Sequence, residues 1–355
     1  MKKILFALLA ATMLIGCQEK KEEFIIDLVF PLTGNGAAAS KATTNAIQMC
    51  VNKWNNNGGF KGKHIVVQHH DSKGQAKEGV IIAKKISINN PDLVVSAMSP
   101  VSLSMLPILE KNNILHLAFS GAQTLFETNP KHVIRGSISP SQIGHNIIRL
   151  FNEHYPQRNL VIFYCMDDFG QGYMNATLDA AQAMNINELR TIAYENNALS
   201  YRELILKSDI SNDDVLFIIG LQGSLGKLIK QVRETGFEGT ILCETNITSA
   251  STLALLSPSH LQNLYYLSMT MDEHLAKPIF TQYYELFGDY PSELALDAYN
   301  NIDVILQILQ ETDLSNISQF IPHLNMHIDG LFGPTSIINY EIQYNLQLKD
   351  GRELL

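Results

Sequence analysis

The segment Leu160-Val161-Ile162-Phe163-Tyr164-Cys165 is a run of apolar and aromatic residues without a charge. A strand that is buried on both faces of a parallel sheet requires such a run, whereas a half-exposed strand alternates polar and apolar residues. Residues 172–184 then carry a helical pattern. A buried strand followed by a helix is the repeating unit of doubly wound α/β folds, so this segment predicts the fold class.

The same unit recurs on both sides of this segment. Before it, helical patterns at about 39–54 and 75–88 lie between predicted strands at 24–30, 64–68, 92–97 and 114–118. After it, further strands are predicted at 191–194, 215–219, 240–243 and 264–267. Two successive series predict two doubly wound lobes with parallel sheets. Such sheets bind ligands beyond the carboxyl ends of their strands, so the cleft between the lobes is the expected ligand site.

The alternation of strand and helix stops after Leu267. Residues 277–288 and 293–311 are long helical patterns, and residues 328–348 are rich in strand-forming residues. A terminal block that does not repeat the alternation indicates that the chain crosses back between the lobes more than once.

Composition excludes several classes of protein. The chain has 355 residues, of which 46% are hydrophobic and 17% charged, with a net charge of −9. This balance excludes a mainly disordered chain, and it argues against binding nucleic acid because no basic face is available to neutralise phosphates. Four cysteines are too few for a disulfide scaffold. We expect Cys50, Cys165 and Cys243 to be free buried thiols, although an exported chain could form a disulfide.

The N-terminus has the pattern of an export signal. Lys2 and Lys3 precede an apolar run at 4–15 that is too short to span a bilayer. The run ends in Leu14-Ile15-Gly16-Cys17, which resembles the lipobox of bacterial lipoproteins. That resemblance implies a signal peptide at 1–16, lipidation of Cys17, a charged tether at 17–23, and a lipid-anchored location in the periplasm or at the cell surface. An uncleaved anchor and a plain secretory signal remain alternatives.

Several short motifs follow one another along the chain, and their order is as informative as their sequences. They are Pro-Leu-Thr-Gly at 31–34, Asn-Gly-Gly-Phe-Lys-Gly-Lys at 57–63, Ser-Gly-Ala at 120–122, Arg-Gly-Ser-Ile-Ser-Pro-Ser-Gln at 135–142, Asp-Phe-Gly-Gln-Gly at 168–172, Val-Arg-Glu-Thr-Gly-Phe at 232–237, Asp-Ala-Tyr at 297–299 and Gly-Leu-Phe-Gly-Pro at 330–334. In this order they resemble the type I periplasmic binding proteins, specifically the branched-chain amino-acid (Leu/Ile/Val) binding family of ABC importers.

The resemblance implies an architecture and a mode of action. It implies two α/β lobes joined by three crossover strands, which close on a small ligand without a chemical reaction and without a cofactor. Lobe one is expected at 24–140 plus 271–328, and lobe two at 141–270 plus 329–355.

The expected ligand site combines donors for a carboxylate with an acid for an ammonium group. Free N–H groups at helix N-termini favour anions, and the turns at 99–102 and 120–123 both follow predicted strands. From the resemblance, the carboxylate is assigned to Ser99, Gly121, Ala122 and Gln123. The ammonium is assigned to Glu244, and the other walls to Phe169, Leu221 and Gln222. Ordinary helix caps and a solvated loop acid are the alternatives.

Three departures from the family pattern affect this site. Pro100 stands where a second serine is common and removes a backbone donor. Gln123 replaces a threonine or serine, and Ala38 and Ala39 replace a bulkier residue. An amide or another small polar ligand therefore stays open.

Other polar groups give weaker signals. His69 and His70 are adjacent on a strand and point to opposite faces, so a metal site is not expected; Asp71 should order the following turn. Asp167 and Asp168 are interpreted as a turn and a cap.

The sequence as a whole predicts an extracytoplasmic substrate-binding lipoprotein of an ABC importer. It would capture an amino acid or a similar small polar solute by hinged closure and then dock on the permease subunits. The alternative on the same fold is a non-transport ligand sensor or a regulator of an envelope enzyme. A hydrolase is disfavoured because no nucleophile and base can be placed at matching strand ends, and the chain contains no G-x-S-x-G elbow.

Overall fold

The computed structural model describes residues 23–34, 36–187, 189–312 and 328–354. The predicted signal peptide, Cys17 and all of the tether except its last residue lie outside these residues. Within them, no helix is both long and apolar enough to cross a membrane.

The first lobe is built on an eight-stranded sheet in the order β11-β12-β13-β5-β4-β3-β1-β2. Its first five strands are β1 (Glu23–Phe30), β2 (His64–Asp71), β3 (Leu93–Ala97), β4 (His116–Phe119) and β5 (Val133–Arg135), and neighbours among them pair in parallel. The remaining three are β11 (Ile328–Gly330), β12 (Gly333–Ile338) and β13 (Glu341–Gln343). β12 runs antiparallel to both of its neighbours.

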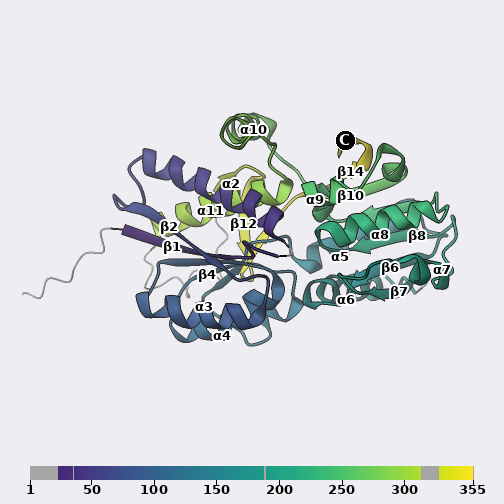
Figure 1. The fold of residues 1–355 in the computed structure, drawn as a ribbon, viewed down its shortest axis with the longest axis horizontal. Helices are drawn as coiled ribbons and strands as arrows, with labels where there is room; N and C mark the ends of the chain where they lie inside the picture. The colour runs from purple at the N-terminus through teal and green to yellow at the C-terminus, as the bar shows by residue number, and fades with distance from the viewer. Residues whose placement is uncertain (1–22, 35, 188, 313–327, 355) are drawn as a thin grey trace, which may run out of the picture.

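Helices cover both faces of this sheet. Figure 1 shows α2 (Ala37–Asn56) and α11 (Glu293–Glu311) on one side, with α3 (Ala76–Asn89) and α4 (Ser99–Lys111) on the other. α10 (Glu273–Phe287) lies beyond α2 and α11, on the side away from the sheet, and its Ala276 packs in the core of the second lobe. β1 is buried at nearly every position, as two covered faces require.

The second lobe has a six-stranded sheet in the order β14-β10-β9-β8-β6-β7. Its strands are β6 (Leu160–Cys165), β7 (Leu189–Tyr194), β8 (Val215–Ile219), β9 (Thr240–Cys243), β10 (Leu264–Met269) and β14 (Leu346–Asp350), of which only β14 is antiparallel. Its helices are α5 (Pro140–His154), α6 (Asp168–Ala183), α7 (Arg202–Lys207), α8 (Gln222–Glu234) and α9 (Ala250–Leu253). Short 3₁₀ turns are η2 (Gln123–Phe126) in lobe one, and η3 (Thr245–Thr248), η4 (Pro258–Leu261) and η7 (Gly351–Leu354) in lobe two.

The predicted fold class is confirmed, because two mostly parallel sheets form two α/β lobes. The strands at 160–165, 215–219 and 240–243 have the predicted bounds. The chain passes between the two sheets three times, after β5, after β10 and after β13.

One predicted boundary is wrong. The sequence analysis placed all of 329–355 in lobe two, but β12 and β13 belong to the first sheet and only β14 joins the second. The physical reason is burial: Ile337 and Ile342 lie in the core of the first lobe, where β13 pairs with β5 at Arg135.

Arg135 ties three segments of the first lobe together. It is 1% exposed, and its guanidinium donates to the Ser120 carbonyl, to the Ala122 carbonyl at 3.0 Å and to Glu341 Oε1 at 2.9 Å. A buried guanidinium needs both an anion and acceptors for its remaining N–H groups. These contacts supply both and fix the turn that follows β4.

Replacing Arg135 with Met should therefore lower the free energy of unfolding by about 3–5 kcal/mol, because Glu341 and two carbonyls lose a buried partner. The measurement is the midpoint of urea unfolding. Arg149→Met is the matched control, since Arg149 forms an exposed ion pair with Glu153 and should change stability by less than about 0.5 kcal/mol. Equal losses in the two variants would contradict this role of Arg135.

Candidate functional site

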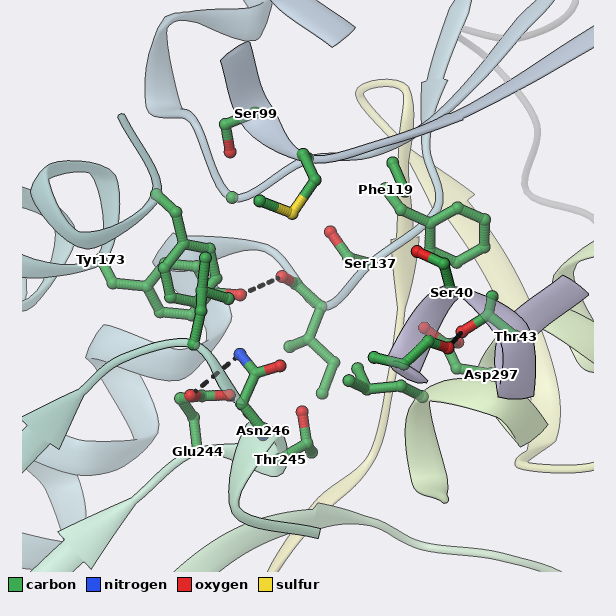
Figure 2. Close-up of a pocket in the computed structure, with 18 of the residues that line it drawn as sticks. Ser40, Thr43, Ser99, Phe119, Ser137, Tyr173, Glu244, Thr245, Asn246 and Asp297 are labelled. Carbon is green, nitrogen blue, oxygen red and sulfur yellow. Dashed lines mark hydrogen bonds between the residues drawn. The ribbon is translucent and has the colours of Figure 1, made fainter. Parts of the chain in front are cut away.

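A cavity lies between the two lobes, where the carboxyl ends of both sheets meet (Figure 2). Its volume is about 130 Å³. Strand ends contribute directly to its walls: Phe30, Ala97, Phe119 and Met269 end β1, β3, β4 and β10. The position agrees with the expected cleft between the lobes, and the size is that of a small solute.

Ser99 places an unused hydroxyl group on the cavity wall. It is the first residue of α4 and only 3% exposed. Its Oγ has no hydrogen-bond partner among the described residues, and Figure 2 shows the side chain at the edge of the cavity. Leaving a buried hydroxyl unpaired costs free energy, so Ser99 is poised to bond to a ligand.

The predicted turn at 120–123 in lobe one packs closely against α6 of lobe two. Gly121 lines the cavity, and a Cβ atom at this position would lie 2.5 Å from ring atoms of both Phe169 and Tyr173. No larger residue fits there unless these rings move. The two rings pack 4.5 Å apart, centre to centre, and close this side of the cavity.

Two of the predicted residues, Ala122 and Gln123, do not line the cavity. Ala122 is buried but does not line the cavity. The amide of Gln123 instead reaches Asp179 on α6, with 3.4 Å between Nε2 and Oδ2, because η2 turns it outward. Gln222 begins α8, and its side chain lies outside the described residues; the preceding Leu221 does line the cavity.

Glu244 faces the cavity from lobe two and is 2% exposed, so the alternative of a solvated loop acid is wrong. Its carboxylate accepts hydrogen bonds from Asn246, at 2.8 Å from the backbone N and 3.0 Å from Nδ2. Burial raises the pKa of Glu244 to about 7. The side chain is therefore oriented, dry and half ionised near neutral pH.

Asp297 faces the same cavity from α11 in lobe one. It is 1% exposed, and its Oδ1 accepts hydrogen bonds from Tyr344 Oη at 2.6 Å and Asn301 Nδ2 at 2.9 Å. Burial raises the pKa of Asp297 to about 7.

The sequence analysis named Asp297 within a family motif but did not assign it to the site. Its signal was a set of polar residues at helical spacing, Glu293, Asp297, Asn300 and Asn301, within a largely apolar helix. The other lining residues that were missed are Ser40, Thr43, Ser137, Ile138, Tyr173, Thr245 and Asn246. Of these, Ser40 and Thr43 could have been noticed from their helical spacing just after the first strand.

The other polar clusters have structural roles. His70 Nε2 lies 2.6 Å from Asp27 Oδ1 on the neighbouring strand, and the described residues contain no group of three or more potential metal ligands. Asp71 accepts from the backbone N–H groups of Lys73 and Leu32, which confirms that it orders the next turn. Asp167 caps α6, as predicted. Cys50, Cys165 and Cys243 are free and buried, also as predicted.

Comparison with known proteins agrees with this geometry. A sequence model of the periplasmic binding protein family matches residues 26–344. The Leu/Ile/Val-binding protein BraC3 of Rhizobium johnstonii is 23% identical over 222 residues, covering 62% of this chain and 60% of that protein. The Leu/Ile/Val-binding protein homolog 1 of Brucella suis is 20% identical over 269 residues, covering 73% and 71%. The chain thus matches about three fifths to seven tenths of the length of these relatives.

Solved structures share the fold. The branched-chain amino-acid substrate-binding protein LivJ of Streptococcus pneumoniae, in complex with isoleucine, superposes with a TM-score of 0.80 at 16% identity, covering 93% of this chain and 97% of that one. The leucine-binding protein LivK of Thermotoga maritima gives 0.81 at 17% identity, covering 92% and 96%.

The raised pKa of Asp297 predicts a pH-dependent effect of Asp297→Asn. Between about pH 4 and pH 7 the unfolded carboxyl is ionised while the folded one keeps its proton, so the native state loses stability as pH rises. Asparagine removes this loss and keeps an oxygen for Tyr344 and Asn301. The variant should therefore gain melting temperature over wild type between about pH 4 and pH 8, with an upper limit of about 4 kcal/mol. A pH-independent difference would contradict the buried titration.

Proposed function

The chain belongs to the periplasmic binding protein family, and we propose that it is the extracytoplasmic substrate-binding protein of an ABC importer. Its ligand would be an amino acid or a similar small polar solute, held between the lobes. The observation that carries this proposal is that Ser99 and Glu244, both buried, line one cavity from different lobes.

A zwitterionic ligand fits the chemistry of the two walls. Its carboxylate would accept a hydrogen bond from the free hydroxyl of Ser99 beside the Gly121 turn. Arg135 withdraws electron density from the carbonyls of this turn, which makes the neighbouring N–H groups better donors. Its ammonium would donate to Glu244, and such charge-assisted hydrogen bonds are the strong ones in a desolvated site.

Closure of the lobes is the proposed working motion. Three chain segments join the lobes, and Glu244 and Phe169 of lobe two line the same cavity as Ser99 and Gly121 of lobe one. A ligand can drive this closure only through its greater affinity for the closed state. Contacts to both lobes provide that difference, and the closed form would then be what the permease subunits recognise.

A binding screen against amino acids and small amides tests the function, and Glu244→Gln tests the assignment within it. A ligand at one hundred times its Kd should stabilise the protein by about 2.7 kcal/mol, which a thermal melt detects. For the ligand so found, Glu244→Gln should weaken binding by about tenfold to hundredfold in calorimetry, because a charge-assisted hydrogen bond is lost.

The control for Glu244→Gln is Glu153→Gln, which removes a half-exposed carboxylate on α5 and should leave Kd unchanged. Unchanged affinity in Glu244→Gln would contradict its role in binding. Absence of any ligand across the screen would favour the non-transport role on the same fold.

We also propose that the chain is a lipoprotein anchored through Cys17, with residues 1–16 as its signal peptide. The support is the sequence Leu14-Ile15-Gly16-Cys17 after a short apolar run. More than one acyl chain is needed for stable anchoring, because a single chain binds membranes only marginally.

The variant Cys17→Ala should move the protein from the membrane fraction to the soluble extracytoplasmic fraction of cells. Cys50→Ala is the control, because this buried thiol cannot be the anchor, and the variant should stay with the membrane. If both variants remain in the membrane fraction, the lipid anchor is at another residue or does not exist.

A further inference from the structure

Two carboxylates from opposite lobes face the same cavity. Glu244 follows β9 in lobe two, and Asp297 lies on α11 in lobe one. Both are at most 2% exposed, and Figure 2 shows them on different sides of the cavity. Tyr173 lies close enough to both acids to feel their charges. Burial is the main cause that raises the pKa of Tyr173, and the charges of Glu244 and Asp297 raise it further.

No cation on the described cavity wall balances these two acids. The lining contains no Lys, Arg or His. Arg135 lies behind the turn at 120–122, but its donors are bound to two carbonyls and its charge is paired with Glu341. Burial raises the pKa of both acids to about 7, so each is only partly ionised at neutral pH, and a bound ammonium group would stabilise its ionised form.

One carboxylate oxygen of Asp297, Oδ2, is available to accept a hydrogen bond from a ligand. Tyr344 and Asn301 both donate to Oδ1 and hold the carboxylate in place, and no donor among the described residues reaches Oδ2. The hydroxyls of Ser40 and Thr43, on the adjoining helix α2, line the same part of the cavity and can accept further N–H donors. The surroundings of Asp297 therefore suit an ammonium group.

We propose that the solute carries two amino groups, one bound by Glu244 and the other by Asp297. This inference rests on the proposed solute-binding function and deepens it. A zwitterion with a single ammonium group donates to one acid and leaves the other without a donor from the ligand. A second amino group at the far end of a short apolar chain neutralises both, while Phe169, Tyr173 and Phe119 contact the methylene groups between them.

Two matched pairs of ligands test the proposal by calorimetry on the purified protein. L-lysine differs from L-norleucine, and cadaverine from pentylamine, mainly by the second amino group. In each pair the ligand with two amino groups should bind at least tenfold more tightly. Tighter binding of L-lysine than of cadaverine would identify a basic amino acid, whose carboxylate meets Ser99; the reverse order would identify a diamine.

The variant Asp297→Asn should weaken binding of the two-amine ligand at least tenfold and change binding of its one-amine counterpart less than threefold. Asp213→Asn, an exposed change in the turn before β8, controls for the loss of one negative charge and should alter neither. If Asp297→Asn does not fold, the comparison of ligand pairs in the unmodified protein still decides.

Two results would overturn the inference. The first is that L-norleucine binds as tightly as L-lysine. The second is that Asp297→Asn weakens the binding of both ligands equally. Either result would leave the solute-binding function intact. If none of the four ligands binds, the two-amine solute is also wrong, and the wider screen alone then decides the proposed function.

Discussion

Burial of parallel strands on both faces is the constraint on which the rest of the structure depends. Once helices cover both sides of β1, β3, β6 and β8, the sheets can present polar groups only at their ends. The carboxyl ends of the two sheets are turned toward each other, so residues distant in sequence meet in one cavity. Ser99 and Glu244 are there because each is placed just after a strand.

Much of this arrangement could be predicted from the sequence, because uninterrupted apolar runs mark buried strands. β6, β8 and β9 have the predicted bounds, and Ser99, Gly121, Phe169 and Glu244 all reach the cavity. The three-residue strand β5 was not identified, because so short a run has no periodicity. Which sheet β12 and β13 join depends on the edge strands of the two sheets. The local sequence of these strands does not indicate the sheet that they join.

The residues that were missed in the site lie mostly on helices or in turns between elements. Asp297 and Tyr173 occupy buried positions of α11 and α6, and their spacing in the sequence is that of ordinary core residues. Their importance appears only when the two lobes are seen together, since each faces a wall that the other lobe supplies. Gln123 shows the converse: its position in a turn was predicted, but the direction of its side chain depends on the contact with α6.

The C-terminal strands complete both sheets, and this affects when the chain can fold during its synthesis. β12 and β13 fill one edge of the first sheet, and β14 fills one edge of the second, so neither lobe is complete until residues 333–350 have left the ribosome. Pairings such as Arg135 with Glu341 join positions that are 206 residues apart, and contacts of such long range form slowly. The two sheets can therefore reach their native strand order only after the C-terminal strands have been synthesised.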